Sequence, residues 1–128
     1  MATRSFHKPL VIGPGRVIVW CTFRPAAGGA PTDVVGKGIK SVTRTAAGLF
    51  DVALQDSYME LEGHEVSLMQ NAASKLVGEL KTEDVASTSA PKVTVRTKDA
   101  NAGTDADIAA NANNRVSLTL YLRNTSVT

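Results

Sequence analysis

The chain has 128 residues, of which 43% are hydrophobic, 20% charged and 5% aromatic, and its formal net charge is +2. This length suits one domain with a hydrophobic core, and the composition argues against wholesale disorder. The small aromatic fraction argues against a large aromatic-lined ligand pocket and against a platform on which bases stack.

The charges are divided unevenly along the chain. Residues 1–50 carry seven Lys or Arg and a single Asp, whereas residues 51–128 carry seven Lys or Arg and eleven Asp or Glu. Opposite potentials steer association, so the two halves can attract other copies of the chain or a complementary surface. The alternative is that the charges intermingle in the fold. Because the basic residues are scattered singly, the pattern does not favour nucleic-acid binding.

The N-terminal segment, residues 1–15, ends in Gly13-Pro14-Gly15 and predicts an extended, irregular arm. It lacks an uninterrupted apolar stretch and a small-residue cleavage site, so we expect synthesis in a cytosol. The longest apolar run, residues 17–21, is far shorter than the roughly 20 residues of a membrane-spanning helix. We therefore expect this arm, one β domain over residues 16–128, and no membrane partner.

Residues 16–24 predict a strand that is apolar on both faces. One face carries the apolar residues at positions 17, 19, 21 and 23, and the other face carries Ile18 and Trp20. Such a strand is central in its sheet or is covered on its second side by a partner. We expect Trp20 in the core. Cys21, the only cysteine, excludes an intramolecular disulfide and reads as a buried, inert thiol.

The elements that follow alternate between strands and loops. Residues 38–56 predict a hairpin with its turn at Gly48, and Asp56 begins a short helical turn over residues 56–63 as its N-cap. Residues 71–85 fit helical spacing and strand spacing, and we favour a strand because a glycine interrupts the helix. The remaining strands are predicted at residues 64–70, 92–98 and 115–123, and irregular loops at residues 25–33 and 99–114.

Six or seven short strands with at most one short helix predict an all-β, mostly antiparallel fold. We expect a small sandwich or an open barrel.

The sequence contains no recognisable catalytic arrangement. His7 and His64 are the only histidines, and neither lies in a motif that would make it a general base. The carboxylates of residues 56–65 are typical of a solvated edge. We therefore predict that the chain is not an enzyme; an enzyme would need a concave site that holds His64 beside several carboxylates.

The loop of residues 99–107 has oxygen-bearing side chains at alternate positions, as calcium loops do. Gly103, Thr104 and Ala110 stand where such a loop has an acid or amide, an invariant glycine and a bidentate Glu. We favour an Asx-rich turn and predict no metal and no cofactor. Long irregular segments are often functional, so we expect the arm and this loop to contact a partner. The residues predicted to make that contact are Arg4, Phe6, His7, Lys8, Leu10, Arg16, Asp99, Asn101, Asp105 and Asp107.

Three segments resemble small structural proteins of tailed-bacteriophage virions. They are the pattern G-x-x-S-V-x-R-T-x-x-G from Gly38 to Gly48, the pattern F-D-V-x-L-Q-D-x-Y from Phe50 to Tyr58, and a last strand that ends in Leu-Arg-Asn. The resemblance spans residues 36–128. It implies a capsid decoration (cement) protein, made in the host cytoplasm, that binds the major capsid protein on the head surface and forms homo-oligomers.

Two alternatives remain open. The first is a tail or head-completion protein of a phage. The second, from another class, is a small carbohydrate- or ligand-binding β module that would use Trp20, Tyr58 and Tyr121, since aromatic faces suit sugar rings.

Overall fold

The computed structural model describes residues 10–13, 15–26, 28–72, 74–109 and 113–123. These residues contain nine strands and no helix, and so none that could span a membrane. The strands are β1 (Leu10–Gly13), β2 (Arg16–Ala26), β3 (Gly29–Lys37), β4 (Ile39–Ala46), β5 (Leu49–Leu54), β6 (Glu60–Met69), β7 (Leu76–Asp84), β8 (Lys92–Asp99) and β9 (Arg115–Arg123).

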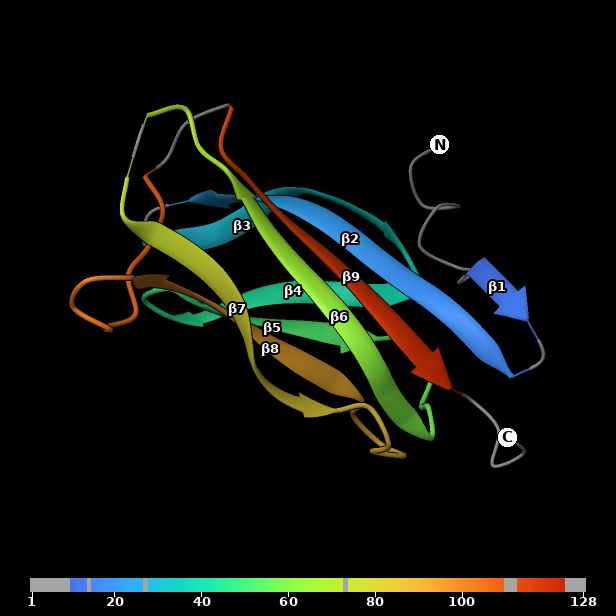
Figure 1. The fold of residues 1–128 in the computed structure, drawn as a ribbon. Coiled ribbons are helices and arrows are strands. Elements are labelled where there is room, and N and C mark those ends of the chain that lie inside the picture. Colours follow the sequence, from blue (N-terminus) through green and yellow to red (C-terminus); the bar gives the residue numbers. More distant parts are fainter. Residues whose placement is uncertain (1–9, 14, 27, 73, 110–112, 124–128) are drawn as a thin grey trace.

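The strands form two antiparallel sheets that pack face to face (Figure 1). The five-stranded sheet has the order β1-β2-β9-β6, and β3 also pairs with β2. β1 pairs with the start of β2 and β3 pairs with its second half, so β1 and β3 share one side of β2. The four-stranded sheet has the order β4-β5-β8-β7. The predicted all-β fold is therefore confirmed as a small sandwich.

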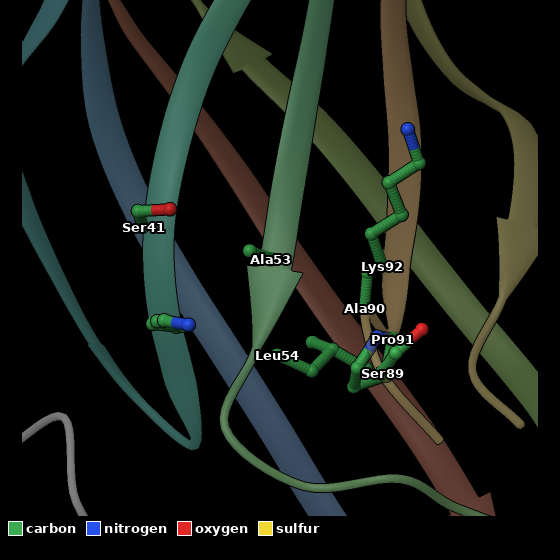
Figure 2. Close-up of a pocket in the computed structure, with 8 residues that line it drawn as sticks. Ser41, Ala53, Leu54, Ser89, Ala90, Pro91 and Lys92 are labelled. Carbon is green, nitrogen blue, oxygen red and sulfur yellow. The ribbon is translucent and has the colours of Figure 1, made fainter. Parts of the chain in front are cut away.

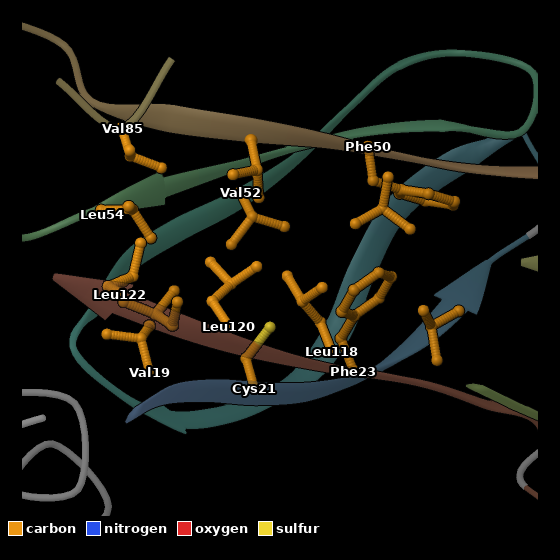
Figure 3. Close-up of a cluster of buried hydrophobic side chains, with 14 of the residues drawn as sticks. Val19, Cys21, Phe23, Phe50, Val52, Leu54, Val85, Leu118, Leu120 and Leu122 are labelled. Atoms are coloured by element: carbon orange, nitrogen blue, oxygen red, sulfur yellow. The ribbon is translucent and has the colours of Figure 1, made fainter. Parts of the chain in front are cut away.

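The core lies between the two sheets (Figure 3). In β2, β5, β8 and β9 every second residue is buried, which is the period of a strand with one face turned inward. The rings of Phe23 and Phe50, one from each sheet, lie 5.1 Å apart at a tilt of 54°. Each fully buried apolar side chain contributes about 1.5–3 kcal/mol, so this layer is the main source of stability. Cys21 lies within it as predicted, and burial raises the pKa of its thiol to about 12.

The arm was predicted to be irregular through residue 15, but Leu10–Gly13 forms β1. Its backbone pairs with β2, with Leu10 opposite Ile18 and Val11 opposite Val17. The correction has a simple cause. Gly15 adopts a φ of 71°, which suits a turn before β2, and the open side of β2 offers hydrogen bonds to the chain that lies along it.

Residues 25–33 were predicted to be a loop, but the described residues of this range belong to the hairpin of β2 and β3. Pro25 lies beyond Phe23, the last residue of β2 that pairs with β9, and Pro31 lies in β3, which pairs only with β2. Pairing between β2 and β3 shifts twice in this region. Proline is tolerated at such edges and bulges because no ladder hydrogen bond is lost there.

The helical turn predicted over residues 56–63 is absent. Tyr58 donates its backbone N–H to the carbonyl of Val85 and Met59 donates to that of Arg123, and β6 then begins at Glu60. Hydrogen bonds to residues far along the chain therefore replace those of a local helix. The strand favoured over residues 71–85 is confirmed as β7.

Candidate functional site

The outer face of the four-stranded sheet is polar and carries ion pairs between neighbouring strands. Asp51 of β5 pairs with Lys92 of β8 at 3.0 Å. Glu79 of β7 pairs with Lys98 at 3.1 Å and also with Arg96. Hydrogen bonds from Lys98 and Arg96 lower the pKa of the Glu79 carboxyl. Charged groups that satisfy one another in this way are typical of a surface that faces solvent.

The outer face of the five-stranded sheet is apolar at its centre. Ile18 and Trp20 of β2 and Tyr121 of β9 point away from the core and are only half-buried. Ile18 lies opposite Tyr121 in the strand register, and Tyr121 lies opposite Gly63 of β6. A Cβ atom at Gly63 would lie 3.5 Å from the Tyr121 ring, so this ring covers the glycine. Trp20 lies two residues along β2 from Ile18 and points to the same face, so the three apolar side chains are neighbours on this face.

One row of residues crosses this face over four strands. Trp20 lies opposite Lys37 of β3 on one side and opposite Thr119 of β9 on the other, and Thr119 lies opposite Glu65 of β6. Directly opposed residues point to the same face, so all four side chains are outward. Lys37 and Glu65 are exposed, and neither forms an ion pair with any other described residue.

We call this surface the aromatic face. Its residues are Ile18, Trp20, Val35, Lys37, Gly63, Glu65, Thr119 and Tyr121. The expectation that Trp20 belongs to the core is wrong, since its side chain lies on the outer side of β2. The prediction that β2 is central is confirmed, because it has β9 on one side and β1 and β3 on the other.

Ion pairs flank the aromatic face at its two ends. At one end Arg16 approaches Glu62 at 3.6 Å and Arg123 pairs with Glu60. At the other end Arg24 pairs with Asp33 at 3.0 Å. Arg16, one of the residues predicted to contact a partner, is thus placed at the margin of this face, with 58% of its side chain exposed.

Of the other contact residues predicted in the arm, only Leu10 belongs to the described part of the chain. It belongs to β1, and its backbone pairs with Ile18 of β2. Arg4, Phe6, His7 and Lys8 lie outside the described residues.

The predicted contact residues of the 99–107 loop make bonds within the chain. The Asp99 carboxylate accepts hydrogen bonds from the backbone N–H groups of Asn101 (2.8 Å) and Ala102 (3.0 Å), which is the Asx-rich turn that the sequence favoured. Asp105 forms a backbone bridge with Lys98. The described residues contain no group of three or more acidic, histidine or cysteine side chains that could hold a metal ion.

Asp107 connects this loop to both sheets. Its Oδ1 accepts hydrogen bonds from the Gly48 N–H (2.8 Å) and Arg44 Nε (3.2 Å), and its Oδ2 accepts from Arg44 Nη2 (2.7 Å) and the Gly28 N–H (3.2 Å). Gly28 and Gly48 are the tips of the β2–β3 and β4–β5 hairpins. The hydrogen bond from Arg44 is the main cause of a lowered pKa at Asp107. The bonds of this carboxylate are therefore structural.

Two concave features lined by described residues are small or open. A hollow of about 170 Å³ lies at the ends of β5 and β8 beside β4 and is lined by residues that include Lys40, Ser41 and Lys92 (Figure 2). Pockets for small ligands are usually about 300–1,000 Å³, so it is small for that purpose. A wider depression of about 450 Å³ contains His64, and Glu83 is the one carboxylate among its lining residues. It therefore does not hold His64 beside several carboxylates.

No protein-family model, characterised protein or solved structure matches this chain. The aromatic face is therefore interpreted from its own residues and their surroundings.

The sequence contained part of the signal for this face. Ile18 and Trp20 made both sides of β2 apolar, which indicated a second covering surface. Nothing in the sequence showed that Lys37, Glu65 and Tyr121 would lie beside them, because those neighbours depend on strand pairing between distant segments.

Proposed function

We propose that this chain is a structural protein of a bacteriophage head. In this proposal it is a capsid decoration protein that binds the major capsid protein and copies of itself, and it stabilises the shell. The observation that carries a protein-binding role is the aromatic face. It places the half-buried side chains of Trp20 and Tyr121 at the centre of a regular sheet, while the outer face of the opposite sheet carries ion pairs.

Tryptophan and tyrosine are the residues most often found as anchors in protein interfaces, because each buries a large area and loses little rotational freedom. A continuous apolar patch with a charged margin is typical of such an interface. The resemblance of residues 36–128 to small virion proteins is the reason for proposing a phage head as the assembly that this face binds. A ligand that binds only the assembled shell stabilises it by mass action, and repeated attachment around a lattice adds weak contacts together.

The direct test uses shells assembled from the major capsid protein of the phage to which this proposal assigns the chain. The purified protein should sediment with the shells and raise their melting temperature. If it sediments instead with tail tubes, the tail alternative is correct. If it binds neither structure, the virion role is refuted.

Deletion of residues 1–9 tests the predicted role of the arm, because all nine described strands are kept. This variant lacks Arg4, Phe6, His7 and Lys8, so we expect it to occupy shells less completely than the full chain. Equal occupancy at equal concentration would show that the arm does not contribute to attachment. The melting curve of the free variant serves as the control for its folding.

A carbohydrate-binding module is the second candidate, and a specific observation favours it. Trp20 and Tyr121 lie on one exposed sheet face, an arrangement on which sugar rings can stack. Tyr58, the third aromatic residue considered, is buried and takes no part in this face. A glycan array probed with the wild type and with Trp20→Ala distinguishes the two candidates: a signal lost on substitution supports the carbohydrate-binding module, and no signal removes it.

A further inference from the structure

The charges on the aromatic face are separated from one side to the other. The margin formed by β2 and β3 carries Lys37, Arg16 and Arg24, with Asp33 already paired to Arg24, whereas the margin formed by β6 carries Glu60, Glu62 and Glu65. Most of these groups already have ionic partners in the described part of the chain. Lys37 and Glu65 do not, although they lie at opposite ends of the row that contains Trp20 and Thr119.

Such a face is complementary to itself under one symmetry operation. The operation is a two-fold rotation about an axis that lies in the interface, parallel to the strands and between β2 and β9. It places the β3 margin of one copy over the β6 margin of the second copy, and each row of opposed residues faces the same row of the second copy. Lys37 of one copy then meets Glu65 of the second copy, and Glu65 meets the second copy's Lys37. Interfaces with two-fold symmetry form every contact twice in this way.

The same operation brings the apolar side chains into register. Trp20 faces the second copy's Thr119, and Tyr121 faces the second copy's Ile18, so a large side chain meets a smaller one in both rows. Sheets that pack face to face lie about 10 Å apart with their strands about 30° from parallel, and their side chains interdigitate. The two copies would thereby bury the patch that remains exposed in the single chain.

We propose that the aromatic face is the interface of a symmetric dimer of this chain, centred on Trp20 and Tyr121 and bordered by two Lys37–Glu65 ion pairs. The proposal rests on the proposed function only in treating this face as a protein-binding surface. A dimer would present two arms and two loop ends to a shell, which increases the strength of attachment through multivalency.

Sedimentation equilibrium of the full chain, together with two charge-reversal variants, tests the proposal. Lys37→Glu and Glu65→Lys each place like charges together at both ion-pair positions of the dimer. We expect each variant to raise the dimer dissociation constant by about tenfold or more. An equimolar mixture of the two should recover dimerisation, because the mixed dimer again pairs an acidic with a basic side chain at both positions.

Lys81→Glu is the matched control. Lys81 is an exposed residue of β7, away from the aromatic face, and forms no ion pair with the described residues. The same change of charge there should leave the dissociation constant unchanged. Because the chain has a single tryptophan, the fluorescence of Trp20 reports on the interface directly and should shift to shorter wavelength as the dimer forms.

Three results would overturn the dimer. The first is a wild type that sediments as a monomer at every concentration or as a trimer. The second is a mixture of the two charge-reversal variants that does not recover dimerisation. The third is a Lys81→Glu variant that associates as weakly as Lys37→Glu does. Shell binding separates this proposal from the function. A monomeric protein that still decorates shells refutes only the dimer, and a dimer that binds no shell refutes only the virion role.

Discussion

Replacing Asp107 by alanine removes the one carboxylate that holds the tips of two hairpins from opposite sheets. In the wild type this carboxylate accepts four hydrogen bonds, two from the Arg44 guanidinium and one each from the backbone of Gly28 and Gly48. The Asp107 and Arg44 side chains are only 17% and 21% exposed, and Gly48 is buried. Truncation therefore leaves a cation and a buried N–H without their acceptor.

The expected cost follows from these contacts. Hydrogen bonds to a charged group contribute about 1.5–3 kcal/mol each, and loss of one partner of a buried pair costs about 3–5 kcal/mol. The Gly28 bond is exposed and the ion pair is partly solvated, so we expect the free energy of unfolding to fall by about 2–4 kcal/mol. For a chain of this length that loss lowers the melting temperature by about 6–20 °C.

The assay is urea unfolding followed by the fluorescence of Trp20, repeated from pH 7 to pH 2. Because the pKa of Asp107 is lower in the folded chain than the ordinary 3.8, its stabilising contribution is present above that value and is lost as the pH falls through the folded pKa. Asp107→Asn should therefore lose less stability than the wild type below about pH 4.

Asp105→Ala is the control, since the Asp105 side chain forms no hydrogen bond or ion pair with the other described residues and lies in the same loop. We expect a change within about 0.5 kcal/mol. If Asp107→Ala destabilised the chain no more than this control, the role assigned to the carboxylate would be refuted.

Three further predictions concern the core. Gly36→Ala should unfold at much lower urea than the wild type, because its Cβ would lie 2.2 Å from the Trp20 carbonyl oxygen, whereas Gly29→Ala, whose Cβ meets nothing closer than 3.7 Å, should be tolerated. Cys21 should resist thiol reagents at pH 8 in the native chain and react fully in urea, because it is buried with a pKa of about 12; rapid labelling without urea would contradict this. Tyr58→Phe should be neutral or stabilising by up to about 1 kcal/mol, as its buried hydroxyl has no partner among the described residues. Burial is the first cause that raises the pKa of Tyr58 to about 12, so the wild type should lose stability between about pH 10 and 12 and the variant should lose less, which alkaline unfolding curves will show.

Local sequence patterns correctly predicted the strands whose own residue preferences agree with their place in the fold. β9 has the predicted bounds because Val116, Leu118, Leu120 and Leu122 alternate with polar residues over its whole length. The β4–β5 hairpin was likewise marked by Gly48, which adopts a φ of 69° at the turn. In both cases the preference of the segment agrees with its place in the fold, so the pattern was sufficient.

Local patterns were misleading where distant pairing decides the structure. Pro25 and Pro31 indicate a loop when they are read alone, and Asp56 indicates the start of a helix. In the fold the prolines lie where strand pairing shifts at the edge of the sheet, and Tyr58 and Met59 donate hydrogen bonds to residues far along the chain. Trp20 was assigned to the core because hydrophobicity alone does not show which of two apolar faces another sheet will cover.

The hydrogen bonds from Gly28 and Gly48 to Asp107, called the clasp here, also determine where this sandwich tolerates an inserted peptide. At that end the Asp107 carboxylate binds the tips of both hairpins. An insertion at Gly28 or Gly48 would therefore break the contact between the two sheets that this carboxylate makes. The turn of residues 86–90, between β7 and β8, lies at the other end of β8 and is mostly exposed. A peptide grafted there would extend into solvent without disturbing the clasp. As a display scaffold, the domain has one end that must be left intact and one end that is open to redesign.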